Sequence, residues 1–380
     1  MPWQEQSIML LRHEFVTLAS QPDANIRALC RQYRISPTTG YTLLARFRAE
    51  GVAGLADRSR RPRSSPRLTP PATEAAVVTL RAEHPAWGGR KLAARLTALG
   101  HVAVPHPNTV TDILRRHHLL PVPEDTRHRA WQRWEREAPN ALWQMDFKGH
   151  FPTATARCHP LTLLDDHSRF ALCLAACPNE QTATVQAHLT AVFSRYGLPV
   201  AILCDNGSPW GTVADHGHTA LTVWLLRLGV AVLHGRPRHP QTQGKEERFH
   251  RTLKAELLTG RVFADLPASQ RAFDQWRDVY NCQRPHDALA LAVPASRYQP
   301  SLVPFPVALP PVAYDAGTTV RQVRDGGRVL LHGQHYRVGQ AFDGYPVALS
   351  PTDHDGVWQV WFAHHPIATL DETTKTAMIV

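Results

Sequence analysis

The sequence has few cysteines and no long apolar run. No stretch approaches the roughly 18 consecutive apolar residues that a membrane-spanning helix needs. Glu5, Arg12 and Glu14 stand where a signal peptide requires an apolar run, so we expect a soluble cytoplasmic protein. The six cysteines have neither the CxxC spacing of zinc sites nor the density of disulfide scaffolds. We expect Cys173 and Cys177 to be buried in a strand rather than bound to metal.

Acidic side chains are outnumbered by basic ones, mainly in the first third of the chain. The 380 residues include 42 Lys and Arg against 32 Asp and Glu, a formal charge of +10. Residues 1–140 hold 21 basic and 12 acidic side chains, or +9, and residues 141–380 hold 21 and 20, or +1. A chain of this length is expected to form about two to four domains. The charge predicts a polyanionic partner such as nucleic acid, bound chiefly by the N-terminal third.

The N-terminal segment has the pattern of a helix-turn-helix domain. Two helices are expected before residue 35, and Ser36 followed by Pro37 is a favourable start for a third helix over 37–49. We predict a DNA-binding domain over 1–55, with any other small helical bundle as the alternative. The candidate DNA contacts on the third helix are Thr38, Thr39, Tyr41 and Arg46.

An arginine-rich segment over 56–70 follows this domain. Its arginines are mixed with Pro and Ser, and no apolar period survives. We expect an extended arm that runs along phosphates, although a solvated linker explains the composition as well. The candidate DNA contacts in this segment are Arg58, Arg60, Arg61 and Arg63.

Residues 71–120 repeat the helical pattern. Each expected helix has an apolar face, and Arg115 and Arg116 remain available for contact with a DNA backbone. We therefore predict a second helical DNA-binding domain, followed by a polar connector over 121–138. The expected helices lie at 71–83, 89–98 and 108–118.

From residue 141 strands alternate with helices, which is typical of an α/β domain. We place this core at 139–292. Six prolines between 294 and 311 predict an irregular linker over 293–312. Alternating runs separated by Gly and Asp turns predict a small antiparallel β-barrel over 313–372. The elements expected in the core are strands at 143–149, 200–204 and 230–233, a hairpin over 160–177, and helices at 182–196, 221–228 and 244–258.

Acidic residues of the core lie at strand and helix ends. Asp146 falls on an expected strand, and Lys148 follows on the same face. Asp205 directly follows an apolar strand, and ligands gather at the carboxyl ends of strands in open α/β sheets. Glu246 and Glu247 lie in the first turn of a helix. Taken singly, each acid is better explained as a strand cap or a turn residue.

Helical phase separates the two glutamates. At about 100° per residue, Glu246 falls on the apolar line that leads to Leu257, which we expect to be buried. Glu247 heads a polar face able to look toward a nucleic-acid backbone, and we therefore choose it as the third acid of the site. The basic residues on this polar face are Arg251 and Lys254.

Three carboxylates brought together repel one another, by roughly 4 kcal/mol for two charges about 4 Å apart at an effective dielectric near 20. A divalent cation removes this repulsion. Oxygen ligands alone favour Mg²⁺ or Mn²⁺, and a two-ion site activates the attacking oxygen and stabilises the leaving oxygen of a displacement at phosphorus. The sequence therefore predicts a metal-dependent phosphoryl-transfer site.

Several ordered motifs resemble the DDE transposases of bacterial insertion sequences that carry a retroviral-integrase-type catalytic core. The motifs are PNALWQMDFKG at 139–149, LTLLDDHSRF at 161–170, LCDNGSPWG at 203–211, HPQTQGKEERFHRTLKAE at 239–256 and YNCQRPHDAL at 280–289, with GLADRSRRP at 54–62 and PAWGGRKL at 85–92 upstream. The resemblance implies an RNase H-like fold and assigns catalysis and metal binding to Asp146, Asp205 and Glu247. The chain departs from the family pattern at Glu246, where many relatives have a small or apolar residue. It also has a longer segment, 41 residues, between Asp205 and Glu247.

The resemblance also implies the chemistry and the partners. An activated water would cut at the end of a mobile DNA element, and the freed 3′ hydroxyl would attack a phosphodiester of target DNA. The implied partners are double-stranded terminal inverted repeats and target DNA, bound by at least a dimer at the nucleoid of a bacterium. The alternatives are a DNA-binding regulator with an inactive core and an RNase H-like nuclease without strand transfer.

Other polar side chains near the motifs are weaker candidates. Asp165 and Asp166 are expected to hold a hairpin turn rather than a metal ion, and His286 to begin a turn. For the basic residues near the site, surface solvation is nearly as good an explanation as contact with DNA phosphates. These candidate contacts are Lys148, His239, Lys245, Arg248, Arg251 and Lys254.

Overall fold

The computed structural model describes residues 7–59, 68–120, 135–211, 218–234 and 244–379. The chain forms two compact units, Met1–Leu68 and Thr69–Val380. Within the described residues, no helix is long and apolar enough to cross a membrane. Four of the candidate DNA contacts, and most of the expected connector, lie outside the described residues. These four contacts are Arg60, Arg61, Arg63 and His239.

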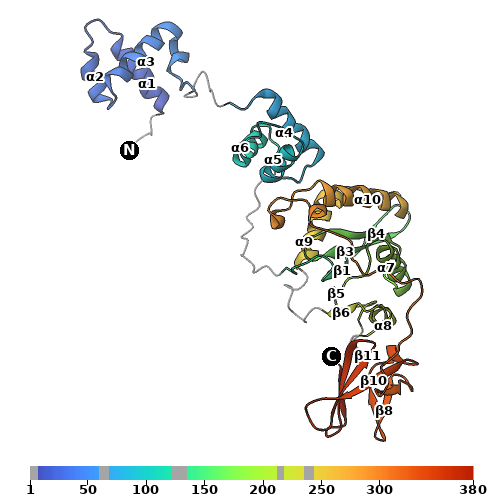
Figure 1. Cartoon of the computed structure of the whole chain (residues 1–380). Helices are drawn as coiled ribbons and strands as arrows, with labels where there is room; N and C mark the ends of the chain where they lie inside the picture. Colours follow the sequence, from blue (N-terminus) through green and yellow to red (C-terminus); the bar gives the residue numbers. More distant parts are fainter. Residues whose placement is uncertain (1–6, 60–67, 121–134, 212–217, 235–243, 380) are drawn as a thin grey trace. The chain divides into compact units, whose positions relative to one another are not determined.

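The first unit is a bundle of three helices, drawn in blue in Figure 1. The Ser36 side chain accepts a hydrogen bond from the Thr39 backbone N–H at 3.1 Å, and Pro37 occupies the first turn, as predicted. α3 packs closely against α2 at Gly40, where any side chain would clash: a Cβ there would lie 2.4 Å from Cys30 Sγ. The expected helices are confirmed as α1 (Ile8–Ala19), α2 (Ile26–Gln32) and α3 (Pro37–Glu50), which a 3-10 turn follows (Gly51–Leu55).

The second unit begins with another helical bundle, and its three helices are those expected. They are α4 (Pro71–Glu83), α5 (Gly89–Ala98) and α6 (Pro107–Arg116). Fully buried Trp87 and Leu92 lie in the core of the bundle with Val110. The basic side of α5 faces the following domain, since Arg95 Nη2 donates to Gln283 Oε1 at 2.9 Å and Arg90 pairs with Asp287 at 3.1 Å.

A mixed sheet forms the centre of the core domain. β1 pairs antiparallel with β3 and parallel with β5, β3 pairs antiparallel with β4 and β2, and β5 pairs parallel with β6. The sequence predicted this alternation but missed the two-residue β2. The strands are β1 (Trp143–Phe147), β2 (Phe151–Pro152), β3 (Arg157–Asp165), β4 (Ala171–Cys177), β5 (Ala201–Cys204) and β6 (Ala231–His234).

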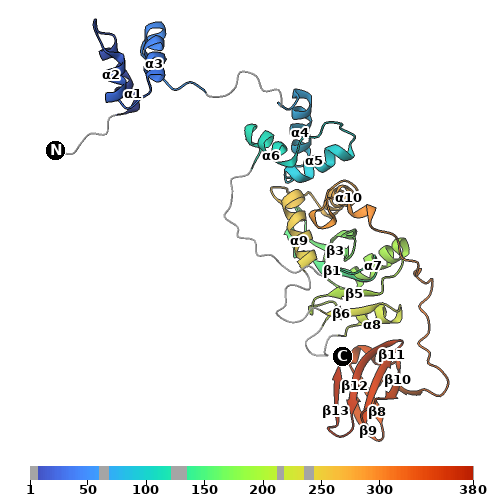
Figure 2. The same ribbon diagram turned by 60° about the vertical axis from the view of Figure 1, so that its left-hand side comes forward.

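Helices cover both faces of this sheet (Figures 1 and 2). α7 (Thr182–Tyr196) and α8 (Ala220–Arg227) pack on one face, around Trp143. α9 (Gly244–Leu253), continued by one π-helical turn (Lys254–Leu258), and α10 (Leu266–Cys282) pack on the other face. Cys173 and Cys177 are buried on β4, as predicted.

Among the helices described in the core, α10 is the one that the sequence analysis did not predict. The Asp265 side chain caps its start by accepting from the Ala268 backbone N–H at 2.7 Å. Its side chains also bond to the backbone of β4: Asn281 Oδ1 accepts from Ala171 N–H at 2.8 Å, and Asn281 Nδ2 donates to the Ala171 carbonyl at 3.1 Å. Gln270 and Arg277 bond further backbone groups of the same strand.

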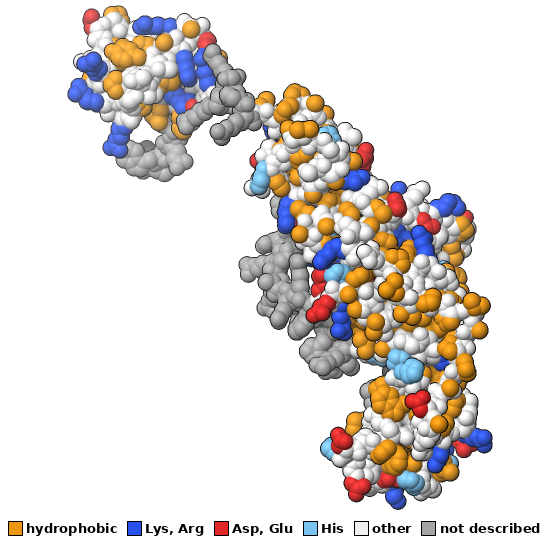
Figure 3. Space-filling model, viewed as in Figure 1, with side chains coloured by type: hydrophobic (Ala, Val, Ile, Leu, Met, Phe, Trp, Pro, Cys, Tyr) orange, Lys and Arg blue, Asp and Glu red, His pale blue; other side chains and the backbone are white. Residues whose placement is uncertain are grey.

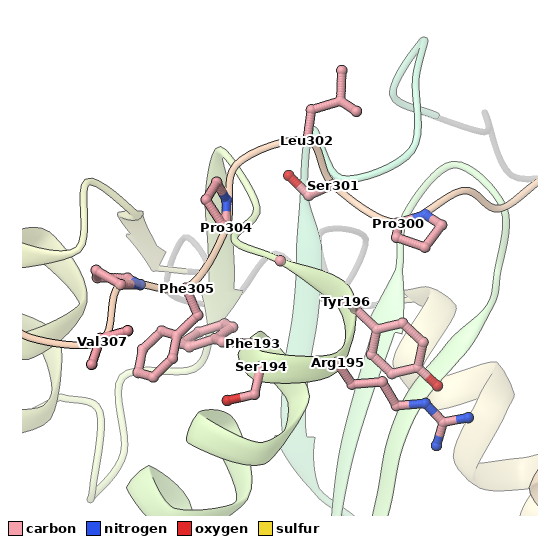
Figure 4. Close-up of a pocket in the computed structure, with 12 residues that line it drawn as sticks. Phe193, Ser194, Arg195, Tyr196, Pro300, Ser301, Leu302, Pro304, Phe305 and Val307 are labelled. Carbon is pink, nitrogen blue, oxygen red and sulfur yellow. The ribbon is translucent and has the colours of Figure 1, made fainter.

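The proline-rich segment connects the core to the last domain. Apart from one 3-10 turn (Pro294–Ser296), it has no regular structure, as predicted. It lies along the end of α7, where the Leu198 N–H donates to the Val303 carbonyl at 2.8 Å. Figure 4 shows Phe305 beside Phe193, and their ring centroids are 5.9 Å apart.

The C-terminal domain is antiparallel, as expected, but its described strands do not close into a barrel. One sheet of five strands runs in the order β13-β12-β11-β10-β7, and β8 and β9 form a separate hairpin. Val329, Val360 and Ile367 are fully buried between them. The strands are β7 (Thr319–Gln322), β8 (Arg328–Leu331), β9 (Gln334–Arg337), β10 (Pro346–Pro351), β11 (Val357–Phe362), β12 (His365–Asp371) and β13 (Thr376–Ile379).

The hydrogen bonds between α10 and β4 are expected to stabilise the core domain. Asn281→Ala is expected to lower the free energy of unfolding of the core by about 1–3 kcal/mol, because the Ala171 N–H and carbonyl lose their partner inside the protein. Asn108→Ala, at an exposed position of α6, is the control and should change it by less than about 0.5 kcal/mol. Urea unfolding of both variants measures the difference, and equal effects would contradict the prediction.

Candidate active site

Parallel pairing of β1 with β5 brings two of the three predicted acids together. Trp143 is the Cα partner of Ile202, and Gln144 is that of Leu203. Continuing this register by two residues places Asp146 beside Asp205, at the carboxyl end of β5. The ordering of these strands therefore produces the pair that the sequence analysis expected.

The Asp146 carboxyl is mostly buried, with 27% of its side chain exposed. Burial, and after it the charge of Asp205, raises the pKa of Asp146 from its ordinary 3.8 to about 7. The Phe147 backbone N–H, and less strongly the charge of Lys148, oppose this shift. Two carboxylates held this close are a site that a cation would stabilise.

Asp205 stands at the start of a tight loop. Its Oδ1 accepts a hydrogen bond from the Gly207 backbone N–H at 3.0 Å and another from Trp210 Nε1. Its backbone carbonyl is 2.9 Å from His234 Nδ1 on the neighbouring strand. Both its side chain and its backbone are therefore fixed by neighbouring groups.

The third predicted acid is not gathered with the first two. Glu247 has 66% of its side chain exposed, and its Oε1 accepts from Arg251 Nη2 at 2.8 Å. Among the described residues, no group of three His, Cys, Asp or Glu side chains is close enough to hold a metal ion. The predicted phase of α9 is confirmed, because Glu246 is 1% exposed and Phe249 and Leu253 are buried on its line.

A buried polar cluster beside Asp146 was missed by the sequence analysis. Thr162 Oγ1 donates to the Asp146 carbonyl at 2.9 Å and lies 2.8 Å from His250 Nε2 and 3.1 Å from Glu246 Oε2. Burial raises the pKa of Glu246 well above its ordinary value, with the charge of Asp146 adding to the effect. Burial and then Lys148 lower the pKa of His250 to about 4. The available signal was the four-residue spacing of Glu246 and His250 on one helix.

Asp165 holds the hairpin turn, as predicted, whereas the Asp166 carboxylate bonds to groups outside the turn. Asp165 Oδ1 accepts from the Ser168 N–H at 2.7 Å and from the Ser168 hydroxyl at 2.6 Å. Asp166 accepts from Gln144 Nε2 at 2.8 Å and pairs with Lys245. His286 precedes a 3-10 turn (Asp287–Leu289), which also agrees with the prediction.

The candidate DNA contacts fall into two groups. An exposed group comprises Thr38, Thr39 and Tyr41 on α3 and Arg248, Arg251 and Lys254 near Glu247, while Arg46 and Lys148 are half-buried. Arg251 is paired with Glu247, and the remaining described candidates are also paired with acids. These pairs are Arg58 with Glu50, Arg115 with Asp112, Arg116 with Glu74, and Lys245 with Asp166.

Several protein-family models match the chain, in order. A helix-turn-helix domain matches residues 12–63, and a homeodomain-like domain matches 39–114. Two models described as an integrase core domain match 136–240 and 228–294. The C-terminal domain of IS481 family transposases matches 318–378.

Curated relatives come from insertion elements and retroviruses. The IS407 uncharacterized 31.7 kDa protein of Burkholderia multivorans is 27% identical over 158 residues, which are 42% of this chain and 55% of that protein. The IS476 uncharacterized 39.2 kDa protein of Xanthomonas euvesicatoria is 27% identical over 157 residues, 41% of this chain and 44% of that protein. The chain thus spans about half the length of these two relatives. The Gag-Pro-Pol polyprotein of simian retrovirus SRV-2 is 34% identical over 121 residues, 31% of this chain and 6% of the polyprotein.

Solved structures of integrases are also similar to the chain. A chain of a simian T-cell lymphotropic virus intasome aligns with 19% identity and a TM-score of 0.37. The match covers 76% of this chain and 97% of the intasome chain. The HTLV-2 integrase catalytic core in complex with magnesium matches 42% of this chain and 97% of its own at 15% identity, with a TM-score of 0.32.

The ordered family models and the insertion-element relatives point to the same kind of protein. Helix-turn-helix models precede an integrase core model, and a transposase C-terminal model follows it. The chain is therefore similar, domain by domain, to transposases of insertion sequences and to integrases.

Proposed function

We propose that this protein is a transposase that binds the ends of a mobile DNA element, cleaves to free 3′ hydroxyls and joins them to target DNA. The observation that carries the proposal is the close pair Asp146 and Asp205 in a domain of integrase type, where burial, and after it the charge of Asp205, raises the pKa of Asp146 to about 7. Such a pair destabilises the protein unless a proton or a cation neutralises it. A phosphoryl-transfer site is the function that this arrangement serves best.

Asp146, Asp205 and Glu247 are the residues that would hold Mg²⁺ or Mn²⁺, with two ions per site. Carboxylate oxygens are the ligands that these ions prefer, so the donor set fits. To bind a cation together with Asp146 and Asp205, the Glu247 carboxylate has to give up its ion pair with Arg251. That exposed ion pair four residues apart on one helix is worth only about 0.3–0.5 kcal/mol, so a cation can displace it. The chemistry that two bound ions supply is activation of the attacking oxygen and stabilisation of the leaving oxygen.

Side chains of the chain itself position the DNA. Arg248, Arg251 and Lys254 are exposed near Glu247 and would bind phosphates on the strand to be cut. In the first step water attacks the phosphodiester, and the broken P–O bond leaves a 3′ hydroxyl. In the second step that hydroxyl attacks a target phosphodiester, and one bond forms as another breaks. Neither step needs a covalent enzyme intermediate or a high-energy cofactor.

The helix-turn-helix unit would recognise the terminal repeats of the element. Thr38, Thr39 and Tyr41 are exposed along the first turns of α3, where a recognition helix presents side chains to base edges. Lys and Arg side chains lie on the face of this unit shown in Figure 3. Two element ends must be held together for joining, so at least a dimer would act on double-stranded DNA. A place of action at the bacterial nucleoid, in the cytoplasm, follows from this substrate.

Replacement of the acids tests the catalytic assignment. Asp146→Asn, Asp205→Asn and Glu247→Gln are each expected to slow strand joining in Mg²⁺ by at least about 1,000-fold, since a metal clamp supplies several kcal/mol to the transition state. Asp353→Asn, at an exposed position far along the sequence, is the control and should join at the wild-type rate.

A gel assay that separates binding, cleavage and joining distinguishes the alternatives. Cleavage without joining in the wild type would indicate a nuclease. Binding without either reaction would indicate a regulator with an inactive core. Wild-type joining by any of the three acid variants would remove that acid from the site.

The raised pKa of Asp146 makes a pH prediction. Below pH 7 the carboxyl holds a proton that competes with the cation, so the rate at limiting Mg²⁺ should fall by about tenfold per pH unit. Saturating Mg²⁺ should move the fall to lower pH, because the cation then displaces the proton. Joining rates between pH 5.5 and 8 measure both curves. A flat profile at limiting Mg²⁺ would contradict the role given to Asp146.

Recognition by α3 is tested with exposed residues that do not support the bundle. Thr38→Ala and Tyr41→Ala should each weaken binding to the terminal repeat by about 1–3 kcal/mol while leaving binding to random DNA nearly unchanged. Thr17→Ala on α1, whose hydroxyl bonds only within its own helix, is the matched control. Fluorescence anisotropy in a salt series measures these affinities. Equal loss on both kinds of DNA would mean that α3 contacts the backbone rather than the bases.

A further inference from the structure

The loop after β5 holds the Asp205 carboxylate from two sides. Oδ1 accepts one hydrogen bond from the Gly207 backbone N–H at 3.0 Å and one from the indole Nε1 of Trp210. A carboxylate that accepts two donors on one oxygen has its plane fixed. Trp210 supplies the side-chain donor of this arrangement.

Trp210 is itself immobilised. It is 2% exposed, and its ring stacks on Phe147, with centroids 5.4 Å apart and planes 22° from parallel. Phe147 directly follows Asp146 on β1. The indole therefore contacts Asp205 through its N–H and the neighbour of Asp146 through its ring face.

The loop leaves little room for larger side chains at Gly207 and Gly211. A Cβ at Gly207 would lie 3.1 Å from Asp205 Oδ2 and 3.3 Å from Oδ1, and a Cβ at Gly211 would lie 2.6 Å from the Asn206 carbonyl oxygen. The Trp210 and Gly211 N–H groups both donate to the Gly207 carbonyl, at 3.1 and 2.8 Å. The Thr219 hydroxyl at the start of α8 also donates to the Pro209 carbonyl at 2.8 Å.

We propose that Trp210 is a positioning residue for Asp205, whose indole N–H holds Oδ1 so that Oδ2 is directed to the divalent cation. The proposal rests on the function proposed above for Asp205. Donors bonded to a metal-ligating carboxylate set its orientation, and their loss typically weakens metal binding by about 10–100-fold. A tryptophan that only filled the core would affect folding and not cation affinity.

Trp210→Phe in the full chain tests the indole N–H, because phenylalanine keeps an aromatic ring and loses the donor. Binding of Mn²⁺ without DNA, measured by electron paramagnetic resonance, should weaken by about 10–100-fold. Trp224→Phe is the matched control, since Trp224 is buried in the same core and stacks on Phe193. This control should bind Mn²⁺ within about twofold of wild type, with an unfolding midpoint close to that of Trp210→Phe.

Gly207→Ala provides a second test if Trp210→Phe does not fold. The added methyl group would crowd both Asp205 oxygens and should weaken Mn²⁺ binding in the same direction. Gly88→Ala is its control, because nothing lies within 4 Å of that methyl position. Wild-type Mn²⁺ affinity in a folded Trp210→Phe or Gly207→Ala variant would overturn the proposal.

Asp205→Asn separates this inference from the proposed function. In that background Trp210→Phe should cause no further loss of Mn²⁺ affinity, and a further loss would show that the indole acts elsewhere. If Asp205→Asn itself binds Mn²⁺ and joins DNA like wild type, the proposed function fails. If Asp205→Asn is impaired while Trp210→Phe matches Trp224→Phe, only the role of Trp210 fails.

Discussion

The parallel pairing of β1 and β5 is the contact on which the candidate site depends. It sets Asp146 against Asp205, 59 positions away in sequence, in surroundings that bury the first carboxyl and raise its pKa to about 7. The fold therefore holds two like charges near each other at a cost in free energy. The layers of helices above and below the sheet supply the apolar contacts that make this cost tolerable.

Local signals were the ones that sequence reasoning could use. Ser36 and Pro37 marked the start of α3, and helical phase correctly separated buried Glu246 from exposed Glu247. Asp146 and Asp205 were chosen because each stood at a strand, and the strand order brought them together. By contrast, the Thr162 cluster joins side chains from different segments, whose meeting depends on packing, and the bond from Trp210 to Asp205 depends on how one loop folds back on itself. Closure of the C-terminal strands into a barrel is not confirmed by the described strands, because alternation fixes which face is buried but not which edges pair.

The two neighbouring glutamates of α9 have different partners. Arg251 is one helical turn from Glu247, and its Nη2 donates to the Glu247 carboxylate at 2.8 Å. Glu246, its neighbour, is committed to the interior with Thr162 and His250. One face of α9 is thus anchored, and the opposite face keeps its charged side chains exposed.

The side chains of α10 that bond to β4 cover the free edge of that strand. β4 pairs with β3 along one side, and its other side would present unpaired backbone groups. Asn281, Arg277 and Gln270 occupy those groups from Ala171 to Ala176, as a further strand would. These backbone groups of β4 are therefore already bonded within the chain and are not offered to a strand of another molecule.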